Sequence, residues 1–369
     1  MADALNIPED RDGLTVDWLR RALSVGAGSS VPPIRDVTYE EIGAGVGMVG
    51  RIVRCQLTYG GGEGFAPTGV IAKLPSSDDN TRRTARQLRL YEREWDFYRV
   101  LALVAPVRSP SLMYGDFDPG THNFVLILED LGHMRTADQV DGASEPQAMA
   151  AIRAAGRLHG QFWDRVGQPP VAAVHSPPAP EHHAMTQSVY QRSLPKAFDL
   201  FGDQFSAPMR KLAESYGSCL AEHAAAMTNR AQTLIHGDFR LDNMFFDDGD
   251  DPGVALVDWQ ANGVGSGLYD IAYFMSSSVT TEVRRAIERD ALEMYREVVN
   301  SNRPGSLTPD GCWRSYRQAM LACFRVPIIA GGQLDLTNER SQRLAGVFLQ
   351  RTLTAMDDLD AGEFLTSEA

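Results

Sequence analysis

The densest group of residues able to do chemistry lies between residues 234 and 260. Asp238 and Asn243 are separated by four residues in the run H-G-D-F-R-L-D-N, and Asp258 follows an apolar stretch farther along. This spacing is typical of phosphoryl transfer, in which one Asp accepts a hydroxyl proton while the Asn and the second Asp bind Mg²⁺. Oxygen ligands of this kind suit a hard cation better than zinc. A turn whose Asp and Asn side chains cap the local backbone is the alternative.

A glycine-rich turn lies well upstream, where Gly45, Gly47 and Gly50 form a G-x-G-x-x-G pattern. Two unrelated phosphate-binding designs share this pattern. A dinucleotide-binding turn opens a helix, whereas the residues after Gly50, RIVRCQLTY, alternate and are rich in β-branched side chains. We therefore predict a strand–turn–strand hairpin whose glycines let a flap approach phosphate groups. An ordinary hairpin without a ligand is the alternative.

Lys73 is one of only three lysines among 35 basic residues, and it lies in the apolar run VIAKL. An ammonium group there is costly unless it meets an anion, which a nucleotide phosphate and a helical carboxylate would supply. A lysine on an edge strand that reaches water is the alternative. A long helical segment is expected at about 81–104, where Glu94 lies on an otherwise apolar face. We predict that Glu94 pairs with Lys73, with Glu92 as the competing residue.

The secondary structure predicted around these residues changes near residue 129. Strand patterns dominate the first third of the chain and helical spacing dominates the rest, apart from short strands within 233–258. This indicates an α+β protein with two lobes. The expected parts are an N-lobe with an antiparallel sheet and one long helix, a hinge, and a larger, mainly helical C-lobe, at 1–128, 129–133 and 134–369.

Length and composition narrow the class of protein. The 369 residues are 43% hydrophobic and 22% charged, which is enough for a packed core in each of two lobes. A net charge of −13 argues against binding to nucleic acid or to an anionic membrane, and weakly fits a cationic substrate. Four scattered cysteines indicate neither a zinc site nor a disulfide scaffold. Without a signal peptide or an apolar membrane span, we expect a cytoplasmic protein.

The chain resembles the aminoglycoside phosphotransferase and choline kinase family, which has the protein-kinase-like two-lobed fold. Its closest likeness is to the subgroup that contains the ecdysteroid kinase-like proteins. The resemblance runs from about residue 35 to 280 and rests on the motifs HGDFRLDN, VDWQ, YDIAYF, LHGQFW and EWDFY. It implies phosphorylation of a hydroxyl group on a small molecule, with ATP and Mg²⁺ as cofactors.

The resemblance also implies roles for individual residues. Asp238 would be the catalytic base, and Asn243 and Asp258 would be the metal ligands. Lys73 with Glu94 would position the phosphates. The run L-E-D-L matches the hinge of the family, so the adenine contacts would come from the backbone at Glu129 and Leu131.

Several residues depart from protein kinases. Gly237 replaces the Arg of H-R-D, Trp-Gln replaces Phe-Gly after Asp258, and no A-P-E follows. These differences favour a small-molecule kinase over a regulated protein kinase. Asp270 is expected to brace the loop of Asp238, and His159 to be a core histidine.

Two other functions remain as alternatives. A catalytically silent nucleotide-binding protein could have the same fold, although the catalytic set is intact. A dinucleotide-dependent oxidoreductase could use the glycine turn, but it leaves residues 233–260 without a role. The acceptor pocket is expected from segments 165–230 and 281–360, which carry no diagnostic motif.

Overall fold

The computed structural model describes residues 5–42, 49–61, 66–176, 178–228, 231–333 and 339–365. The chain divides into two compact units. The N-terminal unit comprises Met1–Val104, Arg108–Met134 and Val257–Ala261, and the C-terminal unit comprises Ala105–Val107, Arg135–Leu256 and Asn262–Ala369. The N-terminal unit thus includes a short segment from the later part of the chain, which carries Asp258. The functional division into an N-lobe, a hinge at 129–133 and a C-lobe stays a prediction.

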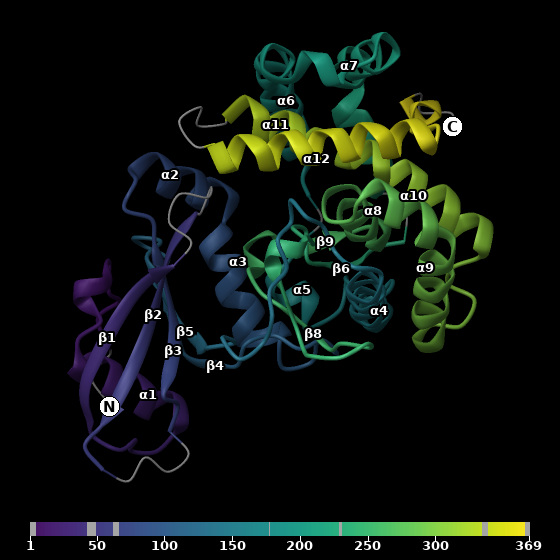
Figure 1. Cartoon of the computed structure of the whole chain (residues 1–369). Helices are drawn as coiled ribbons and strands as arrows, with labels where there is room; N and C mark the ends of the chain where they lie inside the picture. Colours follow the sequence, from purple (N-terminus) through teal and green to yellow (C-terminus); the bar gives the residue numbers. More distant parts are fainter. Residues whose placement is uncertain are drawn as a thin grey trace. The chain divides into compact units, whose positions relative to one another are not determined.

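An antiparallel sheet of five strands forms the N-terminal unit (Figure 1). Its spatial order is β1-β2-β3-β5-β4. The runs RIVRCQLTY and VIAKL lie in two of these strands, as predicted, and β4 lies at one edge of the sheet. The strands are β1 (Ile34–Ile42), β2 (Gly50–Tyr59), β3 (Gly69–Pro75), β4 (Leu112–Phe117) and β5 (Phe124–Glu129).

Helix α1 (Val16–Ala27) covers one face of this sheet and builds its core. The helix begins where the Thr15 hydroxyl accepts a hydrogen bond from the backbone N–H of Trp18. Trp18 and Leu19 are buried against strand residues such as Val53, and the Trp18 ring meets Tyr114 of β4 edge-on at 5.6 Å. This apolar face holds the sheet that positions Lys73.

The helical segment predicted at 81–104 is interrupted at Arg89. Helix α2 (Asp79–Leu88) ends there, because Arg89 has a φ of 56° in the left-handed region. Helix α3 (Leu90–Asp96) then begins and continues into one π-helical turn, η2 (Phe97–Leu101). The single long helix is therefore two helices, and the second of them carries Glu94.

The C-terminal unit is mainly helical, as predicted. Its two small antiparallel sheets pair β6 (Thr233–Ile235) with β9 (Gly263–Gly265), and β7 (Met244–Phe246) with β8 (Val254–Leu256). The helices are α4 (Glu145–Phe162), α5 (Val171–Val174), α6 (Pro180–Phe201), α7 (Ala207–Thr228), α8 (Gly267–Ser277), α9 (Thr281–Asn302), α10 (Pro309–Cys323), α11 (Arg325–Gln333) and α12 (Glu339–Asp358).

Helix α8 lies at the centre of this unit, and every one of its residues is buried. It packs against α4, α10 and α12 (Figure 1). A helix that is surrounded on all sides is fixed in position, so its polar side chains can orient other groups. Asp270 and Tyr273 are two such residues, and both point toward the loop that carries Asp238.

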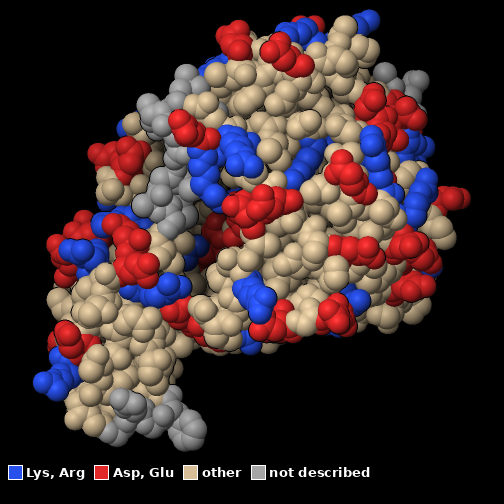
Figure 2. Space-filling model, viewed as in Figure 1, with Lys and Arg blue, Asp and Glu red and all other residues tan. Residues whose placement is uncertain are grey.

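The surface carries charges of both signs. On the face drawn in Figure 2, acidic and basic side chains are interspersed. Among the described helices, none is both long and apolar enough to cross a membrane.

Candidate active site

A buried ion pair joins the sheet of the N-terminal unit to helix α3. Lys73 lies on β3 between Ile52 of β2 and Leu126 of β5, and its Nζ is 2.6 Å from Glu94 Oε1. Only 1% of the Glu94 side chain is exposed. The predicted pairing of Lys73 with Glu94 is therefore confirmed. The competitor, Glu92, instead binds Arg89 on the helix surface at 2.7 Å.

The same ammonium group also binds Asp258. Lys73 Nζ is 3.0 Å from Asp258 Oδ1, while Gln260 Nε2 donates to Asp258 Oδ2 at 3.2 Å. Burial would lower the pKa of Lys73, but the charges of Asp258 and Glu94 outweigh burial and raise that pKa above its ordinary value. The lysine is therefore an ammonium ion at neutral pH, shared by two carboxylates.

Asp258 has a strained backbone conformation, and the packing of the next residue, Trp259, keeps it in that conformation. Asp258 has a φ of 62°, which is rare for a residue other than glycine. Trp259 is fully buried, and its ring stacks on Phe97 of η2 with centroids 3.6 Å apart and planes at 7°. Glu94 also accepts a hydrogen bond from the backbone of Trp259. The Trp-Gln that replaces Phe-Gly thus anchors Asp258 beside Lys73.

Asp238 lies in the C-terminal unit, where three side chains hold its carboxylate. Its Oδ2 accepts hydrogen bonds from Asn243 Nδ2 at 2.9 Å and Arg240 Nε at 3.2 Å, and its Oδ1 accepts one from the Tyr273 hydroxyl at 2.9 Å. The 3₁₀ turn η4 (Leu241–Asn243) places Asn243 back toward Asp238. The side chain of Asp238 remains 22% exposed. The carboxylate is therefore fixed in orientation and still open to another molecule.

The surroundings keep Asp238 ionised. Burial raises the pKa of this carboxyl group, but the nearby Arg240, His236 and Tyr273 lower it more, so the net shift is downward. An ionised carboxylate can accept a hydrogen bond from an alcohol and then its proton. Among the residues that the structure describes, Lys73, Glu94 and Asp258 come together in the N-terminal unit, and Asp238 and Asn243 in the C-terminal unit.

Asp270 braces the loop of Asp238, as predicted. It is fully buried and accepts hydrogen bonds from the backbone N–H of His236 at 2.7 Å and of Gly237 at 3.0 Å. Gly237 has a φ of 81°, a conformation that explains why glycine stands where protein kinases have Arg. His159 is buried between Asp270, at 3.3 Å, and the Tyr295 hydroxyl, at 2.9 Å. The prediction of a core histidine is thus confirmed.

Replacing Asp270 with Asn should destabilise the C-terminal unit. The substitution puts an amide NH₂ group where a carboxylate oxygen now accepts from backbone N–H groups, which leaves a buried donor without an acceptor. We expect the free energy of unfolding to fall by about 1–3 kcal/mol. Urea denaturation followed by circular dichroism measures this, with Asp290→Asn on the exposed face of α9 as the matched control. Equal unfolding midpoints for the two variants would contradict the bracing role.

Arg240 and Tyr273 were not predicted as site residues. Arg240 lies two positions after Asp238, within the H-G-D-F-R-L-D-N run, so its proximity was readable from the sequence. Tyr273 follows Asp270 by three positions, which places both on one face of α8. Because Asp270 is predicted to contact the loop of Asp238, this spacing indicates that Tyr273 can reach the same loop.

The predicted adenine-binding residues lie at the end of β5. The Glu129 side chain accepts hydrogen bonds from Arg108 at 3.0 Å and from the Ser111 backbone at 3.1 Å. The Glu129 N–H donates to the Ser111 carbonyl at 3.0 Å, and the Leu131 carbonyl accepts from Met134 N–H at 2.8 Å. A role for the backbone of Glu129 and Leu131 in adenine binding stays a prediction.

Of the three predicted glycines, only Gly50 is among the described residues; Gly45 and Gly47 lie outside them. Gly50 pairs with Pro75 at the start of β2, and a Cβ there would come within 2.7 Å of the Leu74 carbonyl oxygen. Close packing between strands thus requires glycine at this position. A role for Gly50 in phosphate binding stays a prediction.

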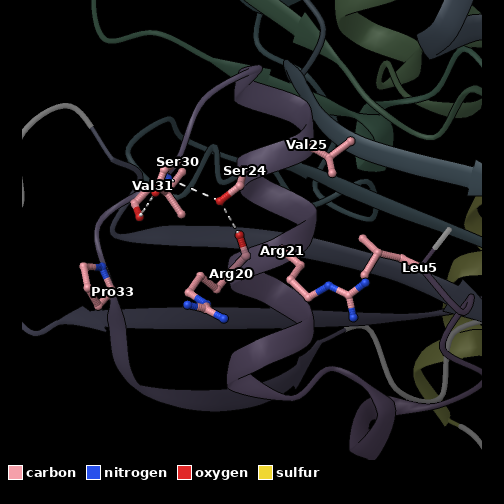
Figure 3. Close-up of a pocket in the computed structure, with 8 residues that line it drawn as sticks. All are labelled: Leu5, Arg20, Arg21, Ser24, Val25, Ser30, Val31 and Pro33. Carbon is pink, nitrogen blue, oxygen red and sulfur yellow. Dashed lines mark hydrogen bonds between the residues drawn. The ribbon is translucent and has the colours of Figure 1, made fainter. Parts of the chain in front are cut away.

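None of these residues lines a pocket of about 330 Å³ in the N-terminal unit (Figure 3). It is formed by α1 and the loop that follows, including Arg20, Ser24 and Val31. Ser24 accepts a hydrogen bond from Val31 N–H at 3.3 Å, and Arg20 pairs with Asp17 at 2.6 Å. These contacts stabilise the end of the helix, and we assign no chemistry to this pocket.

Comparison with known proteins identifies the family. The family model for the ecdysteroid kinase-like family matches residues 44–303. The fold is similar to that of Plasmodium vivax ethanolamine kinase (12% identity, 96% of this chain and 90% of that one, TM-score 0.52). It is also similar to that of Cryptosporidium parvum choline kinase (10% identity, 89% and 91%, TM-score 0.53).

Two further matches differ greatly in extent. An aminoglycoside 2′-phosphotransferase solved as its GDP complex is 13% identical over 95% of this chain and 99% of that one, with a TM-score of 0.50. A probable acyl-CoA dehydrogenase of Arabidopsis thaliana, IBR3, is 37% identical over 46 residues, which are 12% of this chain and 6% of that protein. The first shares the protein-kinase-like fold, and the second shares a short segment. Because the family model spans most of the sequence, this chain belongs to the ecdysteroid kinase-like family of small-molecule phosphotransferases.

Proposed function

We propose that the protein transfers a phosphoryl group from ATP to a hydroxyl group of a small molecule in a Mg²⁺-dependent reaction. The observation that carries this proposal is the Lys73 ammonium ion held between Glu94 and Asp258, at 2.6 Å and 3.0 Å. A buried cation with a fixed position is what the α- and β-phosphates of a nucleotide require. The fold shared with an aminoglycoside phosphotransferase solved with GDP supports nucleotide use.

In this proposal Lys73 binds the phosphate oxygens and Glu94 keeps it in place. Glu94 is itself fixed by burial and by the backbone of Trp259, so the ammonium group cannot turn away. Positioning of this kind provides most of the rate enhancement in phosphoryl transfer, because the protein does little covalent chemistry. The Gly45, Gly47 and Gly50 flap would approach the phosphates, and the backbone of Glu129 and Leu131 would hold adenine.

Asp238 is proposed as the base. Its two oxygens are oriented by Asn243, Arg240 and Tyr273, so one fixed carboxylate faces the acceptor. The acceptor hydroxyl would donate a hydrogen bond to this carboxylate and pass its proton to it as the acceptor oxygen bonds to the γ-phosphorus of ATP. The bond from that phosphorus to the bridging oxygen breaks in the same step, and ADP leaves. Arg240, which lowers the pKa of Asp238, keeps the carboxylate ionised before this step.

The proposed metal ligands have suitable chemistry for Mg²⁺. Asp258 offers a carboxylate, and Asn243 directs its Nδ2 toward Asp238, which leaves its amide oxygen pointing elsewhere. Magnesium prefers a few protein oxygens completed by phosphates and water. The described residues include no cluster of three His, Cys, Asp or Glu side chains suited to another metal. When bound, Mg²⁺ would neutralise charge on the nucleotide phosphates.

A cytoplasmic location fits this function. All four cysteines are free thiols, and ATP is available in a reducing compartment. The alternative function, a silent nucleotide-binding protein, predicts nucleotide binding with no transfer.

Metal removal tests the proposal. Phosphate transfer from ATP to a panel of hydroxylated compounds should occur with Mg²⁺, fall to background in EDTA, and return when excess Mg²⁺ is added. Mass spectrometry of the phosphorylated acceptor measures transfer directly, and Mg-ADP binding by calorimetry serves as the parallel readout. Tight Mg-ADP binding with no phosphorylated product from any acceptor would instead support the silent nucleotide-binding protein.

A further inference from the structure

A second pocket, of about 160 Å³, lies wholly within the C-terminal unit. Its wall is built by α6, α7, α8, the β6–β9 pair and the start of α11. The apolar part of the wall includes Leu220, Met227, Ile235 and Val264, and no Asp or Glu is among the described residues that line it. The pocket therefore has a large apolar part, a set of neutral polar side chains that includes Thr186, Gln232 and Ser266, and no carboxylate among its described residues to receive a cation.

This pocket lies next to the proposed base. Ile235 precedes Asp238 by three residues, and it lines the pocket. Tyr269 also lines the pocket and stacks on Tyr273, with ring centroids 6.0 Å apart and planes at 10°. The Tyr273 hydroxyl in turn donates to Asp238. The wall residue Tyr269 thus packs directly on Tyr273, the residue that donates to the Asp238 carboxylate.

Arg325 contributes a charged group to the pocket wall. Its guanidinium lies over the Tyr269 ring, 4.8 Å from the centroid, and it forms a hydrogen bond with the Tyr216 side chain. Within the described parts of the chain, no carboxylate forms an ion pair with Arg325. Burial and the charge of Arg325 lower the pKa of the nearby His183, which is therefore neutral at physiological pH. The pocket thus presents a guanidinium group on a wall that combines apolar, aromatic and neutral polar side chains and has no carboxylate among its described residues.

We propose that the acceptor is a hydroxylated compound with an apolar body and a carboxylate group, and that Arg325 recognises the carboxylate. This inference rests on the proposed function, because it places the acceptor beside the proposed base. A guanidinium group binds a carboxylate through paired hydrogen bonds, and the apolar part of the wall accepts the apolar body of the molecule.

An amine acceptor does not suit this pocket. An ammonium group would lose water, meet no anion among the described lining residues and be repelled by Arg325. The acceptor preference is therefore opposite to the cationic substrate that the net charge of −13 weakly suggested. Overall charge describes the whole surface, whereas the pocket is lined by few residues.

A matched series of compounds tests the preference. The series consists of ω-hydroxyalkanoates of increasing chain length, the corresponding primary amides, and amino alcohols of the same lengths. Calorimetry with the full chain measures binding, and ATP-dependent phosphorylation is measured in parallel. The carboxylates should bind about 10- to 100-fold more tightly than the amides, as expected for hydrogen bonds to a charged group. Tighter binding of the amino alcohols, or no binding of any carboxylate, would overturn the proposal.

Substitution of Arg325 tests whether this residue causes the preference for carboxylates over amides. In Arg325→Gln the ratio of carboxylate to amide affinity should fall to near one, and because it is a ratio it does not depend on how much protein is folded. Arg289→Gln is the matched control, since Arg289 also lies over an aromatic ring, that of Trp313, but does not line the pocket. An unchanged ratio in Arg325→Gln would refute the role of Arg325.

The two proposals fail in different ways. Carboxylates that bind through Arg325, with no phosphorylated product from any hydroxylated compound, would leave the pocket as a carboxylate-binding site and contradict the phosphotransferase. Amino alcohols that are phosphorylated in preference to carboxylates would support the phosphotransferase and contradict the assignment of the pocket to a carboxylate acceptor.

Discussion

Asp238→Asn should lower kcat for phosphoryl transfer by about 10²- to 10⁴-fold, the range expected when a positioned general base is removed. Asn has nearly the same shape as Asp but cannot take the proton of the acceptor hydroxyl. The change also turns the Asp238 oxygens, which accept from Asn243, Arg240 and Tyr273, into one oxygen and one NH₂ group. We expect KM for ATP to change much less than kcat, because the proposed contacts of Asp238 are with the acceptor. Steady-state kinetics with both substrates measure the two constants.

Asp242→Asn is the matched control for this experiment. Asp242 lies in the same loop and also binds Arg240, at 2.7 Å, but it contacts neither Asn243 nor Tyr273 through its carboxylate among the described hydrogen bonds. We expect its kcat to stay within a few-fold of wild type. Thermal unfolding of both variants shows whether the loop remains folded. Equal losses of kcat in the two variants would mean that the loop needs its negative charge and that Asp238 has no special role.

The parts of the site that the sequence predicted are those set by local pattern. Helical periodicity puts Glu94, and not Glu92, on the apolar face of the helix, and the structure places Glu94 against Lys73. The break at Arg89 did not disturb this choice, since Glu94 and its apolar neighbours all follow the break. Asp270 was likewise assigned to bracing from its place in a turn-to-helix sequence.

What the sequence could not predict depends on contacts between distant segments. The edge strand β4 lacks a strong alternating pattern, and all of its residues are only half-buried. The stacking of Trp259 on Phe97 joins residues from opposite parts of the chain. The pocket beside Arg325 is lined by residues from 178 to 325, so its lack of acidic side chains emerges only when the helices are packed.

The second large effect is expected at Lys73. Lys73→Met keeps the length and the apolar stem of the side chain but removes the ammonium ion that Glu94 and Asp258 share. Two effects should follow. The rate should fall by about 10²- to 10³-fold, as when a group that stabilises transition-state charge is lost. The free energy of unfolding should fall by about 3–5 kcal/mol, because carboxylates are left without their cation.

A set of substitutions on α3 separates these two effects. Glu94→Gln should lower activity because Lys73 is no longer held, whereas Glu92→Gln, on the exposed face beside Arg89, should be near wild type. The double variant Lys73→Met/Glu94→Gln should be more stable than the sum of the single losses predicts, by about 1–3 kcal/mol, because it removes both members of the buried pair. The double variant should remain as inactive as Lys73→Met. It regains part of the lost free energy of unfolding, but it still lacks the ammonium ion that is proposed to bind the phosphates. Recovery of activity together with stability would show that Lys73 supports the fold and does not act on the nucleotide.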